Sequence, residues 1–286
     1  MDKRITILDL LAAKREKQKF AAVSCYDYTT ARLVAAAGVE MILVGDSAAM
    51  MLLGHDSTLP VTMDFMVTLT EAVRRAAPGV CLVADMPFLS YQTGIADAVR
   101  NAGRFLQEAG VQIVKFEIKR SQLDLVRAVC DADIPVMAHL GIRPQSAIMQ
   151  GRLKAEATTA EQAYELITLA EDVVRAGAST VLLEGTSRET AALVTQRLSV
   201  PVISCGSGPD CDGQILIIND ILGLSDQPPK FARMFAALSP VIVKAVEKYA
   251  AQVRAGRFPD NAHSYHMKSG QIEILRKMLK NDFPSV

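Results

Sequence analysis

The sequence contains no tryptophan, and aromatic residues make up only 5% of its 286 residues. Lys and Arg together number 31, as do Asp and Glu, so the formal net charge is zero. Proteins that bind nucleic acid usually carry a basic surface, and those that bind single strands also present aromatic rings for stacking. We therefore expect neither a nucleic acid nor an anionic membrane surface among the partners of this protein.

Long apolar segments are also missing. No run approaches the roughly 18 residues that a transmembrane helix needs, and no apolar stretch typical of a signal peptide follows the first residues, Met1 to Arg4. The five cysteines are odd in number and scattered along the chain. Three of them lie in apolar runs, where cysteine commonly acts as a small buried hydrophobe. These features predict a reduced, cytoplasmic protein.

Half of the residues are hydrophobic, and short β-branched runs alternate with amphipathic stretches. Eight apolar runs are predicted to be strands, namely residues 20–24, 41–44, 80–84, 111–116, 134–138, 180–183, 200–204 and 215–218. Helical patterns between them include residues 63–77, 95–109, 121–132 and 160–176. Because the apolar runs are nearly continuous, they are typical of parallel strands buried on both faces. We therefore predict an α/β fold, a (β/α)₈ TIM barrel, which typically takes about 250 residues.

One connection fits this pattern poorly. Residues 205–214, between the last two predicted strands, are too few for a full crossover helix, so we expect at most one helical turn there. An open, doubly wound sheet is the alternative fold.

The chain continues for nearly seventy residues after the last predicted strand. We predict one domain over residues 1–286, with a helical extension from about residue 239. Ser239 and Pro240 are expected to begin a long helix as N-cap and first-turn residues, and Gly256 with Pro259 to end it. A further amphipathic helix is predicted at about residues 271–279, and its apolar side packs either on its own barrel or on another subunit.

Polar residues stand where the apolar runs end. Asp46 and Ser47 follow the second predicted strand, and Asp85 follows the third. Lys115 and Glu117 lie at the end of the fourth, His139 follows the fifth and Glu184 follows the sixth. In a (β/α)₈ barrel the carboxyl ends of all strands meet at one face, and active sites lie there. We therefore expect these side chains to surround a single active site.

Three carboxylates in this set suggest a metal. Asp46, Asp85 and Glu117 follow neighbouring strands, and no Cys or His stands at ligand spacing beside them. An oxygen-only set favours a hard cation, and Mg²⁺ usually takes one or two carboxylates together with water and substrate oxygens. The alternative is that each carboxylate caps a helix or pairs with Lys115. With three on neighbouring strands, we predict a magnesium site.

The remaining polar residues have both a chemical and a structural interpretation. Lys115 and Glu117, two positions apart, point to the same side of their strand, so Lys115 either stabilises a bound anion or pairs with Glu117. Glu184 is a candidate general base, or it belongs to the start of the helix near Ser187. A Gly-Ser-Gly sequence at residues 206–208 is either a phosphate site or a plain tight turn.

Several motifs together resemble one family. They are Leu43-Val44-Gly45-Asp46-Ser47, Gly54-His55-Asp56-Ser57-Thr58-Leu59-Pro60-Val61-Thr62, Ala84-Asp85-Met86-Pro87-Phe88, Val114-Lys115-Phe116-Glu117, His139-Leu140-Gly141 with Pro144-Gln145-Ser146, Leu183-Glu184, Asp212-Gly213-Gln214-Ile215-Leu216, Pro229-Lys230-Phe231-Ala232 and His263-Ser264-Tyr265-His266. From about residue 5 to residue 266 the chain resembles the 3-methyl-2-oxobutanoate hydroxymethyltransferases (ketopantoate hydroxymethyltransferases). The nine residues from Gly54 are especially specific to that family.

This resemblance implies a step of pantothenate biosynthesis on a barrel of the phosphoenolpyruvate mutase and isocitrate lyase superfamily. A one-carbon unit would pass from 5,10-methylenetetrahydrofolate to 3-methyl-2-oxobutanoate through a Mg²⁺-stabilised enolate. The resemblance implies that Asp46 and Asp85 ligate Mg²⁺ and contact the substrate, and that Glu117 holds a metal-bound water. Ser47 and Lys115 would bind the oxo acid. His139 would line the site and Glu184 would be the base, in a homo-oligomer that is commonly a homodecamer.

The chain departs from the family at three places. Ala48-Ala49-Met50 stands where the family usually has Leu-Gly-Met, and Ile118-Lys119-Arg120 stands where the family has small residues or glycine. The segment from Gln150 to Ala157 has fewer glycines than the family's lid. These changes leave the accepted oxo acid and the folate contacts open. Two alternatives therefore stand beside the transferase: another Mg²⁺-dependent 2-oxo acid lyase or mutase of the same superfamily, and a non-catalytic barrel scaffold.

Overall fold

The structure is a computed structural model, and it describes residues 4–150 and 154–282. Residues 151–153, in the segment compared above with the family's lid, lie outside the described residues. The chain divides into two compact units, Met1–Ala236 and Ala237–Val286. Within the described ranges, no helix is both long and apolar enough to cross a membrane.

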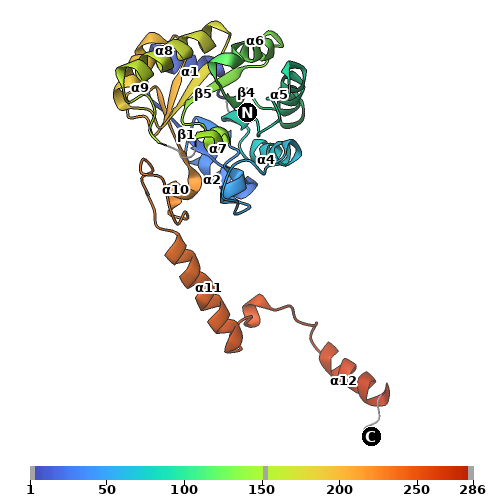
Figure 1. Ribbon diagram of the computed structural model, residues 1–286. Coiled ribbons are helices and arrows are strands. Elements are labelled where there is room, and N and C mark those ends of the chain that lie inside the picture. The colour runs from blue at the N-terminus through green and yellow to red at the C-terminus, as the bar shows by residue number, and fades with distance from the viewer. Residues whose placement is uncertain (1–3, 151–153, 283–286) are drawn as a thin grey trace. The chain divides into compact units, whose positions relative to one another are not determined.

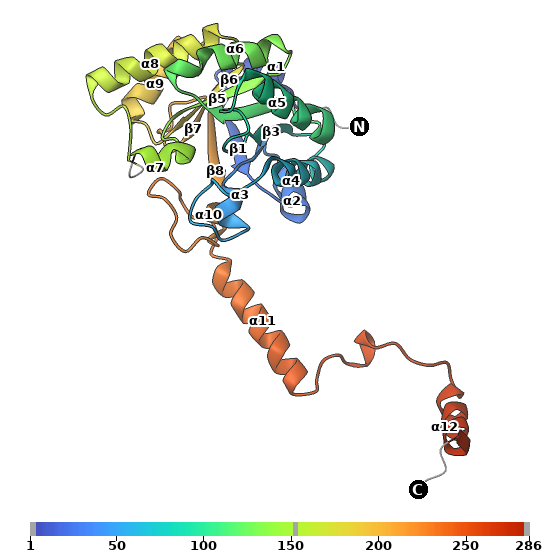
Figure 2. The ribbon, with the colours of Figure 1, turned by 45° about the vertical axis from the view of Figure 1, so that its right-hand side comes forward.

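The first unit is built on a closed barrel of eight parallel strands (Figures 1 and 2). In chain order the strands are β1 (Phe20–Ser24), β2 (Met41–Val44), β3 (Cys81–Asp85), β4 (Ile113–Glu117), β5 (Val136–Gly141), β6 (Thr180–Glu184), β7 (Val202–Cys205) and β8 (Gly213–Ile217). Each strand pairs with its neighbours in sequence, and β8 closes the barrel by pairing with β1. The predicted TIM barrel is therefore confirmed, and the open sheet is excluded.

Helices surround this barrel. They are α1 (Ile7–Arg15), α2 (Tyr28–Ala36), α3 (Ala48–Met51), α4 (Met63–Ala76), α5 (Ile95–Ala109), α6 (Leu123–Asp131), α7 (Ala147–Gln150), α8 (Ala160–Arg175), α9 (Arg188–Arg197) and α10 (Ile218–Leu222). Both ribbon views show α4, α5, α6, α8 and α9 arranged around the outside of the strands. Residues 206–212, between β7 and β8, form turns and bends without a helix, in agreement with the short connection in the sequence.

Local sequence signals set the ends of these helices. Thr62 and Thr159 cap α4 and α8 by accepting a hydrogen bond from the backbone N–H three residues on. Gly110 ends α5 in the left-handed conformation that favours glycine. These helices differ from their predicted ranges by at most one residue at either end.

On several strands the side chains inside the barrel change from apolar to polar toward the carboxyl end of the strand. Those packed in the lower part of the barrel belong to one buried cluster, which includes Phe20, Met41, Leu43, Val83, Ile113, Met137, Leu182 and Ile203. Alternate residues of a strand point to the same side. The next inward positions are therefore Asp85 after Val83, Lys115 and Glu117 after Ile113, and Glu184 after Leu182. The barrel thus has an apolar floor with polar side chains at its carboxyl-end mouth.

The second unit contains α11 (Ser239–Arg254) and α12 (Gln271–Asp282). Helix α11 begins at Ser239, and Leu238 occupies the N-cap position, so the prediction that Ser239 is the cap was one residue too late. Pro240 lies in the first turn, where its missing N–H needs no partner. Both helices carry exposed apolar side chains, among them Val246 on α11 and Met278 on α12.

Candidate active site

A cavity of about 1180 Å³ opens at the carboxyl ends of the strands. Its lining includes all seven residues that the sequence singled out, namely Asp46, Ser47, Asp85, Lys115, Glu117, His139 and Glu184. They come from β3, β4, β5 and β6 and from the loop after β2. The structure therefore confirms that these residues share one cavity.

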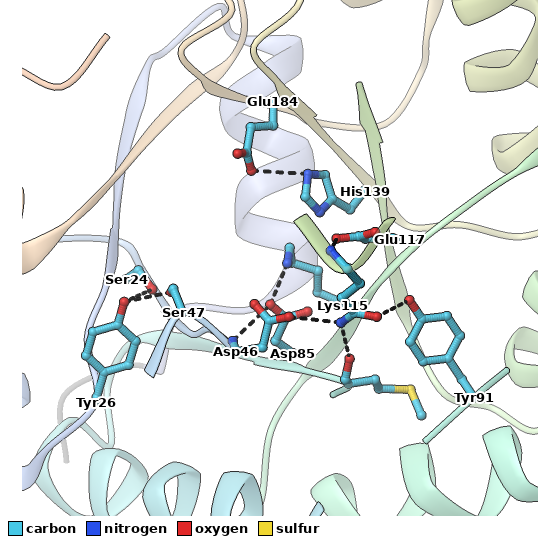
Figure 3. A network of polar contacts seen from close by, with 12 residues as sticks. Ser24, Tyr26, Asp46, Ser47, Asp85, Tyr91, Lys115, Glu117, His139 and Glu184 are labelled. Atoms are coloured by element: carbon cyan, nitrogen blue, oxygen red, sulfur yellow. Dashed lines mark hydrogen bonds and ion pairs between the residues drawn. The ribbon is translucent and has the colours of Figure 1, made fainter. Parts of the chain in front are cut away.

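A buried ion pair lies at the centre of the site (Figure 3). The Lys115 Nζ atom is 2.5 Å from Oδ2 of Asp85, and both side chains are at least nine-tenths buried. The backbone N–H of Asp46 donates to the same Asp85 oxygen at 3.2 Å. Lys115 thus pairs with Asp85 and not with Glu117, because the register of β3 and β4 places Asp85 directly beside Lys115.

Gln145 connects the other two carboxylates. Its backbone N–H donates to Oε1 of Glu117 at 2.8 Å, and its side-chain Nε2 donates to Oδ2 of Asp46 at 2.9 Å. The same Nε2 also donates to the Met86 carbonyl at 3.0 Å. A single residue between β5 and α7 therefore holds carboxylates from two different strand ends.

Each of the three carboxylates has one anchored oxygen. On Asp85 and Glu117 the second oxygen, Oδ1 and Oε2 respectively, is buried and has no hydrogen-bond partner among the described residues. Unpaired buried carboxylate oxygens are costly unless something else binds them. Hard cations prefer such oxygens, so the donor set fits Mg²⁺.

The described residues contain no group of three His, Cys, Asp or Glu side chains that forms a ready metal-ligand set. This finding is compatible with Mg²⁺, which usually binds through one or two protein carboxylates and takes its other ligands from water and substrate. The residues that could hold it are Asp46 and Asp85, with Glu117 further out.

Burial changes the acid–base properties of the cluster. It raises the pKa of Asp85 to about 7, although the Lys115 charge acts in the opposite direction. It also raises the pKa of Glu117 to about 8. For Lys115, burial lowers the pKa, but the negative charges of Asp85 and Asp46 outweigh burial, so the net shift is upward. A bound cation would favour the charged form of both carboxyls.

Glu184 and His139 form the other side of the site. The Glu184 Oε2 atom is 3.3 Å from Nε2 of His139, close enough for an ion pair, but their orientation does not make a hydrogen bond. Burial, followed by the Lys115 charge, lowers the pKa of His139, which favours a neutral imidazole. Gly141 allows this arrangement, because a side chain at that position would collide with the Glu184 backbone. Glu184 is therefore partly exposed, and His139 is the side chain that lies against its carboxylate.

Ser47 is oriented by a tyrosine. The Tyr26 hydroxyl lies 2.7 Å from Oγ of Ser47, and Oγ of Ser24 donates to Tyr26 at 3.4 Å. Tyr26 is fully buried, and burial raises the pKa of its phenol, so it stays protonated and uncharged. This contact fixes Ser47 at the edge of the cavity.

Other candidates have structural roles. The Ser207 hydroxyl donates to the Leu183 carbonyl and accepts from the Thr186 N–H, so it ties residues 206–208 to the end of β6. Ser187 caps α9, which leaves Glu184 outside that cap.

The site also contains residues to which the sequence assigned no role. Gln145, Tyr26 and Tyr91 are all buried, and the Tyr91 hydroxyl donates to Oε1 of Gln145 at 2.7 Å. The sequence pointed to Gln145 only through the Pro144-Gln145-Ser146 motif, which is part of the family resemblance. Its partners lie far away in sequence, so no local pattern reveals them.

The closed barrel and its acidic cavity are typical of a (β/α)₈-barrel enzyme, and comparisons with known proteins identify the family. A family model described as ketopantoate hydroxymethyltransferase matches residues 4–261. The 3-methyl-2-oxobutanoate hydroxymethyltransferase of Pelobacter propionicus is 47% identical over 93% of this chain and 99% of its own. That of Hyperthermus butylicus is 45% identical over 96% of each chain. The chain belongs to the ketopantoate hydroxymethyltransferase family.

This assignment makes the protein an enzyme, a hydroxymethyltransferase, and it argues against the alternative of a non-catalytic scaffold. Among solved structures, the fold is similar to that of 2,3-dimethylmalate lyase, described as a member of the PEP mutase/isocitrate lyase superfamily. The TM-score is 0.59 at 20% identity, over 96% of this chain and 94% of the lyase. At this identity the likeness concerns the fold alone.

Proposed function

We propose that this enzyme transfers a hydroxymethyl group from 5,10-methylenetetrahydrofolate to 3-methyl-2-oxobutanoate, giving 2-dehydropantoate for pantothenate biosynthesis. The observation that carries the proposal is the cavity itself, where three anchored carboxylates and Lys115 face the carboxylate of Glu184. The names of the close relatives support the choice of substrates.

The metal in this proposal is Mg²⁺. Asp46 and Asp85 would hold it directly, and Glu117 would hold it through a water molecule. When bound, the ion would stabilise negative charge on the oxygens of the 2-oxo acid. The unpaired Oδ1 of Asp85 and Oε2 of Glu117 support this assignment.

The chain's own residues perform the proton transfer. Glu184 removes the proton from C3 of the oxo acid as general base. His139, neutral and fully buried beside it, limits the positions that the Glu184 carboxylate can take. Lys115 supplies a fixed positive charge near the developing negative charge, and the Ser47 hydroxyl, held by Tyr26, binds the oxo acid.

The size of the cavity supports a second substrate. A volume of about 1180 Å³ exceeds what a small 2-oxo acid needs. We propose that the reduced folate occupies the outer part, where Met50, Lys230 and Phe231 contribute to the lining. The homo-oligomer and the cytoplasmic location stay predictions of the sequence.

The test is Mg²⁺-dependent exchange of the C3 proton of 3-methyl-2-oxobutanoate in deuterated water, followed by NMR with and without tetrahydrofolate. We expect exchange that chelation of the metal abolishes, and product only when methylenetetrahydrofolate is added. As a control, 3,3-dimethyl-2-oxobutanoate has no C3 hydrogen and gives no exchange. Absence of exchange with every branched 2-oxo acid would overturn the transferase proposal and favour a superfamily lyase or mutase.

A further inference from the structure

We propose that Gln145, held in place by Tyr91, is a positioning residue that decides which oxygens of Asp46 and Glu117 face the cavity. This inference rests on the proposed function, because it treats those carboxylates as the metal site. Gln145 lies in a short 3₁₀ turn, Pro144–Ser146, and only 6% of its surface is exposed.

The side-chain amide of Gln145 has no spare donor toward the site. Its two N–H groups go to Oδ2 of Asp46 at 2.9 Å and to the Met86 carbonyl at 3.0 Å. The backbone N–H of the same residue holds Oε1 of Glu117 at 2.8 Å. As a result, one oxygen of each carboxylate is fixed against Gln145, and the other oxygen is left for a ligand.

Two residues on the side away from the carboxylates, Tyr91 and Gln92, set the orientation of this amide. Oε1 of Gln145 accepts from the Tyr91 hydroxyl at 2.7 Å and from Nε2 of Gln92 at 3.1 Å. A flipped amide would place its NH₂ group against the NH₂ group of Gln92 and would lose both donors to Asp46 and Met86. Tyr91 is itself fixed, because it is buried and its ring packs 5.2 Å from that of Phe116. The orientation of Gln145 is therefore determined by residues that do not touch the carboxylates.

Only a neutral amide of this length satisfies every partner. Glutamate at position 145 would place a fourth negative charge against Asp46, which the amide now approaches with a donor. Methionine has a similar size but no donor, so Oδ2 of Asp46, the Met86 carbonyl and the Tyr91 hydroxyl would each lose a partner. This arrangement resembles the outer hydrogen bonds that orient metal ligands in many proteins.

The test compares Gln145→Met and Tyr91→Phe with the wild type by Mn²⁺ binding, measured by electron paramagnetic resonance without any oxo acid. We expect the Kd to rise about 10- to 100-fold in Gln145→Met, the range seen when outer hydrogen bonds of metal ligands are removed. Tyr91→Phe keeps Gln145 but removes one of the two donors to its amide oxygen, so we expect a smaller rise, about 2- to 10-fold. Gln162→Met, the same change at an exposed position on α8, serves as the control and leaves the Kd unchanged.

Thermal unfolding of the metal-free proteins separates positioning from general stability. If both variants are folded and bind Mn²⁺ within twofold of the wild type, the role of Gln145 is overturned while the metal site stands. A folded wild type that binds no Mn²⁺ would instead overturn the proposed metal site. Should Gln145→Met fail to fold, Tyr91→Phe decides alone, and an unchanged Kd in that variant overturns the proposal.

Discussion

The two sides of the active-site cavity are built differently. The side that we call the anchored wall consists of Asp46, Asp85, Lys115, Glu117 and Gln145, all nearly buried and tied together by hydrogen bonds and an ion pair. The open wall consists of Glu184, Cys205 and Asp220. Among the described residues, these side chains make one polar contact, the 3.3 Å approach of Glu184 to His139. Figure 3 shows Glu184 beside His139 and away from Asp46 and Asp85.

This difference suggests a division of labour. Metal and substrate oxygens need ligands fixed in advance, because any movement weakens binding and charge stabilisation. A general base must instead reach a proton and then give it up, so some freedom of the carboxylate is compatible with its role. We therefore expect substitutions in the anchored wall to affect stability and metal affinity, and those in the open wall to affect only chemistry, or nothing.

The largest effect is expected for Asp85→Asn. This change leaves the Lys115 ammonium buried without its counter-ion, and removing one partner of a buried pair typically destabilises a protein by about 3–5 kcal/mol. The free energy of unfolding, measured by urea denaturation without metal, should fall by about that amount. Adding Lys115→Met should recover part of the loss, and no recovery would mean that the pair is not the cause.

Glu117→Gln should act on metal binding. The amide is the same size as the carboxylate, but it carries no charge and has only one oxygen. Glu117 has two, one that accepts from the Gln145 N–H and one left for the cavity. We expect the Kd for Mg²⁺, measured by calorimetry, to rise about 10- to 100-fold. A Kd equal to that of the wild type would remove Glu117 from the anchored wall.

Tyr26→Phe should have a moderate effect. It removes the hydroxyl that holds Ser47, a single hydrogen bond worth about 1 kcal/mol. We expect the KM for the oxo acid to rise about 2- to 10-fold, while metal affinity stays unchanged. Tyr28→Phe is a matched control, because Tyr28 is exposed at the start of α2. Equal KM values in both variants would show that Ser47 needs no such support.

Asp220→Asn should have the smallest effect. Asp220 is buried and lines the cavity, yet its side chain forms no hydrogen bond to a described residue that the change could break. We expect Mn²⁺ affinity to stay within about twofold of wild type, and stability within about 1 kcal/mol. A tenfold loss of metal affinity would show that Asp220 supports metal binding, as the residues of the anchored wall do.

Much of the fold and part of the site follow from periodicity. Continuous apolar runs gave the parallel strands, and the polar residue at each strand end identified the cavity, because strand alternation places Asp85, Lys115 and Glu184 above apolar inward neighbours. Alternation within one strand does not show which residues of two neighbouring strands lie side by side. It left Asp46, Asp85 and Glu117 all as candidate partners of Lys115, and the strand register selects Asp85.

The supporting residues could not be predicted in this way. Gln145 reaches Asp46 across 99 positions of sequence, and its partner Tyr91 lies in a loop between β3 and α5. Neither residue belongs to a repeating pattern, and both depend on how loops approach one another over the closed barrel. Hydrogen bonds of this kind become visible only when the three-dimensional structure is known.

The division between the two walls is tested most directly by Glu184→Gln, assayed for both Mn²⁺ binding and C3 proton exchange. The account predicts a Kd within about twofold of wild type, together with exchange slowed by about 10²- to 10⁴-fold, the usual contribution of a general base. Wild-type exchange rates in this folded variant would contradict the assignment of Glu184 as base. If the variant loses both Mn²⁺ binding and C3 proton exchange, the separation of the two walls is contradicted.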